Sequence, residues 1–148
     1  MRALALLFAA ALAAAPAVAQ GDGLPLSGVG GEQLDRSDLA RGTTIIVVWA
    51  SWSPRCRDIV PRVNALAGRW SGQARVVTVV FQEDRDAVSR FLAGADLRAP
   101  VFVDSDGSFS KRHAITTLPG LLVLVDGRIA YRGPLPDDAD RVISELLG

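Results

Sequence analysis

The chain has 148 residues, with 16 lysines and arginines balanced by 16 aspartates and glutamates, and it contains a single cysteine, Cys56. The absence of a basic patch excludes an electrostatic nucleic-acid-binding surface, and the lone cysteine excludes an intrachain disulfide. This length accommodates one ordinary domain built around one core.

The N-terminus has the pattern of an export signal. Arg2 supplies a positive charge, residues 3–15 form an apolar run, and residues 17–19 (Ala-Val-Ala) form a small-x-small cleavage site. The run is shorter than the roughly 20 apolar residues that a membrane-spanning helix requires. We therefore predict a signal peptide over residues 1–19 and a mature protein that is periplasmic or secreted and does not span a membrane.

The next segment is predicted to lead into the folded domain. Residues 20–42 form an N-terminal lead-in, which is glycine-rich and polar, and residues 43–148 form the domain itself. Within the lead-in we expect a loop with one helical turn near Leu39, for which Asp35 and Ser37 are possible N-caps. Residues 43–50 are continuous and β-branched, which predicts a central strand buried on both faces.

A helix is predicted after this strand. Ser53 followed by Pro54 is typical of a helix start, because serine caps the free backbone amides and proline fits the first helical position. The helix should extend to about Trp70. Its apolar residues recur at spacings of three and four, which predicts one buried stripe, and Cys56 extends that stripe towards the helix start.

The rest of the chain alternates between strand and helix patterns. Further strands are predicted at residues 76–81, 100–103 and 121–125, and the last forms a hairpin with residues 128–131 across Asp126-Gly127. Helices or helical turns are predicted at residues 86–95, 108–114 and 137–147. The alternation predicts an α/β fold with a central mixed β-sheet and helices on both faces.

Three segments carry a family resemblance. Residues 48–57 read Val-Trp-Ala-Ser-Trp-Ser-Pro-Arg-Cys-Arg, and residues 99–104 and 117–124 follow in order. These segments resemble thioredoxin-like proteins, in particular the exported TlpA and ResA group of thiol-disulfide oxidoreductases, whose motif is Trp-Ala-x-Trp-Cys-x-x-Cys. The resemblance covers about residues 26–148. It implies a thioredoxin fold, a cis peptide bond before Pro119, and a substrate-binding surface formed by Trp52, Pro54, Leu118 and Pro119.

The motif departs from this group where the chemistry takes place. Ser53 stands in the position of the nucleophilic first cysteine, Ile59 in the position of a frequent glutamate, and Gly120 in the position of the usual threonine. Val47 stands where thioredoxin itself has a buried acid. Disulfide exchange needs a thiolate to attack and a second thiol to release the product, and a serine hydroxyl supplies neither. Ordinary two-cysteine disulfide exchange is therefore excluded.

Cys56 and Ser53 remain the candidate catalytic residues, and Cys56 has two interpretations. A place in the first helical turn favours a thiolate, whereas a place on the buried stripe makes the cysteine a small inert hydrophobe. The corresponding cysteine of the family is the more shielded of the two. Arg55 and Arg57 flank the thiol in sequence, but helix geometry directs their side chains to other faces.

Three functional hypotheses follow. The first is a monothiol or redox-silent module that binds exported polypeptides or thiol partners, a mixed disulfide being one route. The second is a one-cysteine peroxidase or thiol transferase that depends on external thiols, because Ser53-x-x-Cys56 resembles the Thr-x-x-Cys of peroxiredoxins. The third is a structural scaffold without thiol chemistry. We expect no cofactor and no metal, because one histidine and one cysteine are too few for a metal site. The oligomeric state is not indicated.

Overall fold

The computed structural model describes residues 22–148, so the predicted signal peptide over residues 1–19 lies outside the described residues. Its strands are β1 (Leu26–Gly28), β2 (Gln33–Leu34), β3 (Thr43–Trp49), β4 (Arg75–Phe81), β5 (Val101–Asp104), β6 (Gly120–Val125) and β7 (Arg128–Pro134). Its helices are α1 (Arg36–Leu39), α2 (Ile59–Trp70), α3 (Arg85–Ala93), α4 (Ser108–Arg112) and α5 (Ala139–Leu147), and a 3-10 turn, η1 (Pro54–Cys56), precedes α2. Within residues 22–148, no helix combines the length and the apolar character needed to cross a bilayer.

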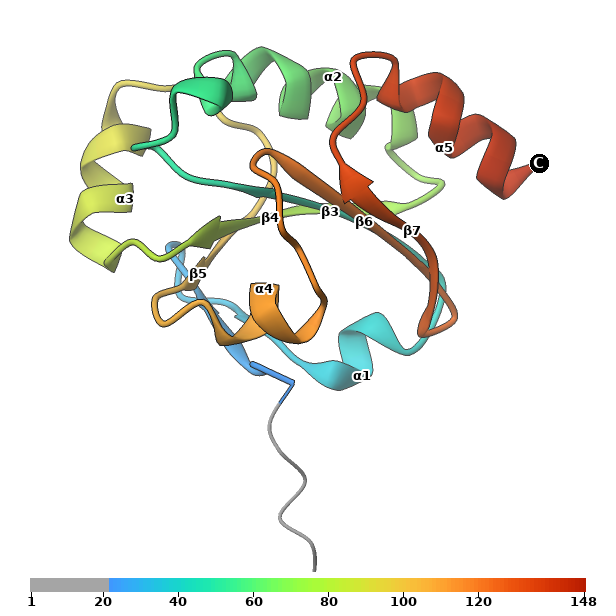
Figure 1. Ribbon diagram of the computed structural model, residues 1–148, viewed down its shortest axis with the longest axis horizontal. Coiled ribbons are helices and arrows are strands. Elements are labelled where there is room, and N and C mark those ends of the chain that lie inside the picture. The colour runs from blue at the N-terminus through green and yellow to red at the C-terminus, as the bar shows by residue number, and fades with distance from the viewer. Residues whose placement is uncertain (1–21) are drawn as a thin grey trace, which may run out of the picture.

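The strands form one seven-stranded sheet in the order β2-β1-β5-β4-β3-β6-β7. The central strands β3, β4 and β5 run parallel to one another, whereas β6 and β7 at one edge and β1 and β2 at the other pair antiparallel with their neighbours. Helices α2, α3 and α5 cover one face of the sheet, and α1 and α4 cover the other (Figure 1). The predicted mixed sheet with helices on both faces is confirmed.

The continuous apolar run of β3 is explained by burial on both faces. Successive side chains of a strand point to opposite sides of the sheet. Val47 and Trp49 pack in the cluster that contains the α2 and α5 side chains, and Ile46 and Val48 pack in the cluster that contains the α1 and α4 side chains. A strand covered twice has no solvent-facing side, and the predicted central strand is therefore confirmed.

The lead-in segment differs from the expected loop. Residues 26–34 include β1 and β2, and β1 extends the sheet by pairing antiparallel with β5. Leu26 and Leu34 anchor these strands in the core. Strands of two or three residues are too short to display an alternating pattern, which is why the sequence does not reveal them. The expected helical turn is α1, with Asp35 at its N-cap and the Asp35 N–H donating to the carboxylate of Asp38.

The helix predicted from Pro54 to Trp70 is interrupted. After η1 the chain turns, and α2 begins only at Ile59. Pro61 provides the physical reason, because it has no N–H to donate and is tolerated only within the first turn of a helix. A helix running unbroken from Pro54 would place Pro61 in its interior, whereas a start at Ile59 places it in the first turn.

The interruption changes the surroundings of the motif. Ser53 has extended backbone at the start of η1, but its hydroxyl makes no capping hydrogen bond, so the predicted side-chain cap is wrong. The Ser53 carbonyl instead accepts from the Cys56 N–H at 3.0 Å, the i to i+3 bond that closes a 3-10 turn. Cys56 therefore precedes α2, and the first-turn argument for a thiolate no longer applies.

Candidate functional site

The thiol of Cys56 is buried. The residue is 4% exposed and packs in an apolar cluster with Val47, Trp49 and Ile59. A cysteine reacts with reagents or partners only where they can reach the sulfur. The arrangement therefore supports the inert interpretation of Cys56. Within residues 22–148, no three histidine, cysteine, aspartate or glutamate side chains are grouped to hold a metal ion.

A groove of about 390 Å³ lies beside the motif. It is lined by Trp52, Ser53, Arg55, Phe81, Ile115, Thr116, Thr117 and Leu118. The Trp52 side chain is 56% exposed, and its ring centroid lies 6.5 Å from that of Phe81. The motif turn thus forms one wall and the loop before β6 forms the other, with an aromatic pair between them.

The structure brings together two of the four predicted substrate-binding residues. Trp52 and Leu118 both line the groove. Pro119 is buried and does not line the groove, and the Leu118–Pro119 peptide bond is cis, as the resemblance implied. Pro54 is exposed on η1 and does not contribute to the lining. Phe81 was missed in the sequence because it completes a strand whose apolar pattern already accounts for it.

The backbone of Leu118 retains hydrogen-bonding capacity. Within residues 22–148, no backbone hydrogen bond involves its N–H or C=O, whereas the next carbonyl, that of Pro119, accepts from the Leu135 N–H at 2.9 Å. An extended chain that lies along the groove can pair with such a free backbone segment as an added strand. The groove therefore offers both side-chain and main-chain contacts.

Glu83 is hydrogen-bonded to the loop that carries the motif, and its role was not predicted from the sequence. The residue is 8% exposed, and its two carboxylate oxygens accept from the N–H and the hydroxyl of Ser51, each at 2.5 Å. Ser51 follows β3 closely and Glu83 follows β4, and these strands are parallel neighbours. Carboxyl ends of parallel strands meet at one edge of a sheet, where sites are commonly built, and that signal could have identified Glu83. The contact holds the loop that carries Trp52 and Ser53.

We expect Glu83→Gln to lower the free energy of unfolding by about 1–3 kcal/mol, measured by chemical denaturation. Glutamine keeps one carbonyl oxygen that can accept from the Ser51 N–H, but its uncharged amide can only donate, so the Ser51 hydroxyl must rotate to accept and both charge-assisted hydrogen bonds are lost. Ser51→Ala removes one donor and keeps the other. The double variant should therefore lose less than the sum of the two single losses, and simple additivity would contradict the contact.

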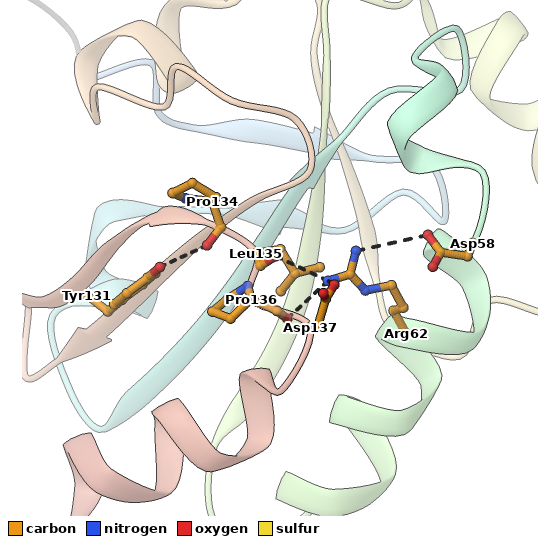
Figure 2. Close-up of polar contacts among 7 residues, drawn as sticks. All are labelled: Asp58, Arg62, Tyr131, Pro134, Leu135, Pro136 and Asp137. Atoms are coloured by element: carbon orange, nitrogen blue, oxygen red, sulfur yellow. Dashed lines mark hydrogen bonds and ion pairs between the residues drawn. The ribbon is translucent and has the colours of Figure 1, made fainter.

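A hydrogen-bonded chain links the helix after the motif to the loop that carries Leu118. Nη2 of Arg62, on α2, donates to the carbonyl of Leu135 at 3.1 Å and to that of Pro136 at 3.0 Å. Figure 2 shows the guanidinium reaching from α2 to the segment that follows β7. The Leu135 N–H in turn donates to the Pro119 carbonyl. Arg62 thereby connects α2, which follows the motif turn, to the end of the loop before β6.

We expect Arg62→Ala to lower the free energy of unfolding by about 1–2 kcal/mol, because two hydrogen bonds from a charged donor are lost. The Arg62 side chain is only 21% exposed, with the exposed carboxylates of Asp58 and Asp137 at 4.0 and 3.7 Å. Arg98→Ala is the matched control. Its pair with Asp96 is exposed, so its loss should change stability by less than about 0.5 kcal/mol. Equal effects of the two substitutions in thermal or urea denaturation would contradict the role of Arg62.

Comparisons with known proteins identify relatives of this chain. The Redoxin family model matches residues 10–147. Sporulation thiol-disulfide oxidoreductase A of Bacillus subtilis is 28% identical over 85 residues, which are 55% of this chain and 52% of that protein. The chain therefore spans about half the length of the curated relatives it matches.

Solved structures share the fold. The pneumococcal exposed lipoprotein thioredoxin of Streptococcus pneumoniae superposes with a TM-score of 0.74 at 22% identity, covering 84% of this chain and 97% of that one. A secreted disulfide oxidoreductase of Mycobacterium tuberculosis gives a TM-score of 0.69 at 18% identity, covering 85% and 96%. These likenesses show that the backbone has the thioredoxin-like fold.

Proposed function

Because this chain belongs to the redoxin family, we propose that it is an exported member of the TlpA and ResA type that binds extended polypeptide segments without exchanging disulfides. The burial of Cys56 beside an open groove is the observation that carries this proposal. The only thiol is buried, whereas the groove in which a partner chain would lie is open.

The chemistry of disulfide exchange explains why burial matters. A thiolate must reach a partner's disulfide, form a mixed disulfide, and then be displaced by a second thiol. At the groove that first position is occupied by Ser53, which forms no sulfur–sulfur bond. Cys56 lies beneath it at 4% exposure. The peroxidase and thiol-transferase hypotheses both require an exposed sulfur, so the geometry favours them less.

The groove itself argues against a purely structural scaffold. Exposed tryptophan is enriched at protein interfaces, and Trp52 forms an aromatic pair with Phe81 at the groove. The free backbone of Leu118 adds a site for main-chain pairing. Export, with a mature chain that starts near Gln20, is supported by the predicted signal peptide and by the exposed and secreted proteins among the structural relatives.

Peptide binding tests this function. A fluorescent peptide with one phenylalanine in an extended, serine- and threonine-rich sequence should bind the purified protein, measured by fluorescence anisotropy. Trp52→Ala should weaken binding roughly tenfold, since buried aromatic anchors dominate such interfaces. Ile129→Ala is the control, because Ile129 is an exposed apolar residue on β7 outside the groove. Equal binding by the two variants, or no binding by the wild type, would refute the proposal.

A further inference from the structure

Arg55 is the single charged residue among those that line the groove. All the others are apolar or carry a hydroxyl or an indole group. The Arg55 side chain is exposed and, within residues 22–148, it forms no ion pair. An unpaired guanidinium in an otherwise uncharged groove is available to pair with a negative group on a bound molecule.

No carboxylate of the site neutralises this charge. Glu83 is buried, and both of its oxygens are bound to Ser51. A guanidinium presents a rigid fork of donors that matches the two oxygens of a carboxylate. The aromatic ring of Trp52 and the apolar side chain of Leu118 line the same groove, so a bound segment that covers them would reduce the solvent screening of a charge pair formed there.

We propose that the groove selects extended polypeptide segments in which an acidic side chain lies near an apolar one, with Arg55 reading the carboxylate. This inference rests on the proposed function and names its substrate class. The apolar side chain packs on Trp52 and Phe81, and the backbone of the segment runs beside Leu118. Since side chains two residues apart in an extended chain share a face, the acidic and apolar residues should be separated by one residue.

Three labelled peptides test the proposal by fluorescence anisotropy. They share one extended sequence with a phenylalanine and differ two residues away, where they carry glutamate, glutamine or lysine. The wild type should bind the glutamate peptide roughly fivefold more tightly than the glutamine peptide, and the lysine peptide most weakly. Raising the salt concentration should shrink the difference, because an ion pair at a groove rim is still partly screened.

Two matched arginine variants test whether Arg55 causes the preference for glutamate. Arg55→Gln should abolish the preference for glutamate, so that the glutamate and glutamine peptides bind this variant with equal affinity. Arg57→Gln should keep the preference, because Arg57 is an equally exposed neighbour that does not line the groove. Circular dichroism and the unfolding midpoint of each variant should match the wild type, since both side chains are on the surface.

The outcomes separate this inference from the function on which it rests. Binding of the glutamate and glutamine peptides with equal affinity would overturn the acidic selectivity and leave the binding function standing. Loss of the preference in both arginine variants would show that general positive potential, and not Arg55, reads the peptide. Failure of every peptide to bind would overturn the proposed function and the inference together.

Discussion

In the native protein, Cys56 should react with iodoacetamide at least roughly a thousandfold more slowly than in the denatured chain. Cys56 is 4% exposed and belongs to the same buried apolar cluster as Val47, Trp49 and Ile59. A reagent can therefore reach it only through opening of the structure, and the population of open states in a stable domain is of this order or smaller. Labelling rates followed by mass spectrometry with and without denaturant measure the ratio.

A second variant shows that the method detects a reactive thiol at this site. Ser53→Cys combined with Cys56→Ala moves the only thiol into the groove lining, where it should be labelled in the native state within about tenfold of the denatured rate. If native Cys56 is labelled as fast as this surface thiol, the Cys56 sulfur is accessible to reagents and partners in the folded protein. The monothiol, peroxidase and transferase hypotheses would then replace the redox-silent one.

Ser53→Cys alone should give the chain disulfide oxidoreductase activity. Ser53 and Cys56 are the first and last residues joined by the bond that closes η1, with 3.0 Å between the Ser53 oxygen and the Cys56 nitrogen. Side chains three residues apart in a 3-10 turn eclipse each other, so the two sulfurs would be adjacent. Under oxidation they should form a disulfide, detected by mass spectrometry as the loss of two hydrogens.

The reaction follows from the positions of the two thiols. The introduced thiolate attacks a partner's disulfide and forms a mixed disulfide, releasing one partner thiol. The Cys56 sulfur then attacks the introduced sulfur, releases the second partner thiol and leaves the variant oxidised until dithiothreitol reduces it. Insulin reduction with dithiothreitol should therefore rise at least roughly tenfold above wild type, which should remain at background.

Two controls make this prediction decisive. Adding Cys56→Ala to the Ser53→Cys variant removes the internal resolving thiol, so the mixed disulfide with insulin should accumulate when dithiothreitol is omitted, and turnover with dithiothreitol should fall below that of Ser53→Cys. A folded Ser53→Cys variant that forms no internal disulfide would contradict the geometry of η1. Insulin reduction by the wild type at the level of the variant would contradict the redox-silent function itself.

The regular elements were predictable because their signals are local. The β-branched run at residues 43–50, the Asp126-Gly127 turn and the order of strands and helices each follow from neighbouring residues. Asp126 and Gly127 have φ of 50° and 79°, the left-handed pair that a tight hairpin favours. The break before Ile59 was also encoded locally, in Pro61, but the apolar stripe that continues across it concealed the signal.

The site depended on contacts between segments far apart in the chain. Glu83 and Ser51 lie on different strand ends, and Trp52 meets Phe81 only because β3 and β4 are neighbours in the sheet. Arg55 becomes a candidate recognition residue only when the loop before β6 closes the groove around it. The spacing of residues within one helix or strand gives no information about such contacts between elements.

By itself, the sequence determined that this domain has a thioredoxin-like sheet and only one thiol with which to act, because backbone patterning and residue identity are properties of the chain. Whether that sulfur meets solvent was decided by the tertiary structure, which packs Cys56 beneath the motif turn and leaves Trp52 and Arg55 exposed beside it. Burial is set by which surfaces meet when β3, η1 and α2 pack together, and short-range sequence patterns do not contain that information.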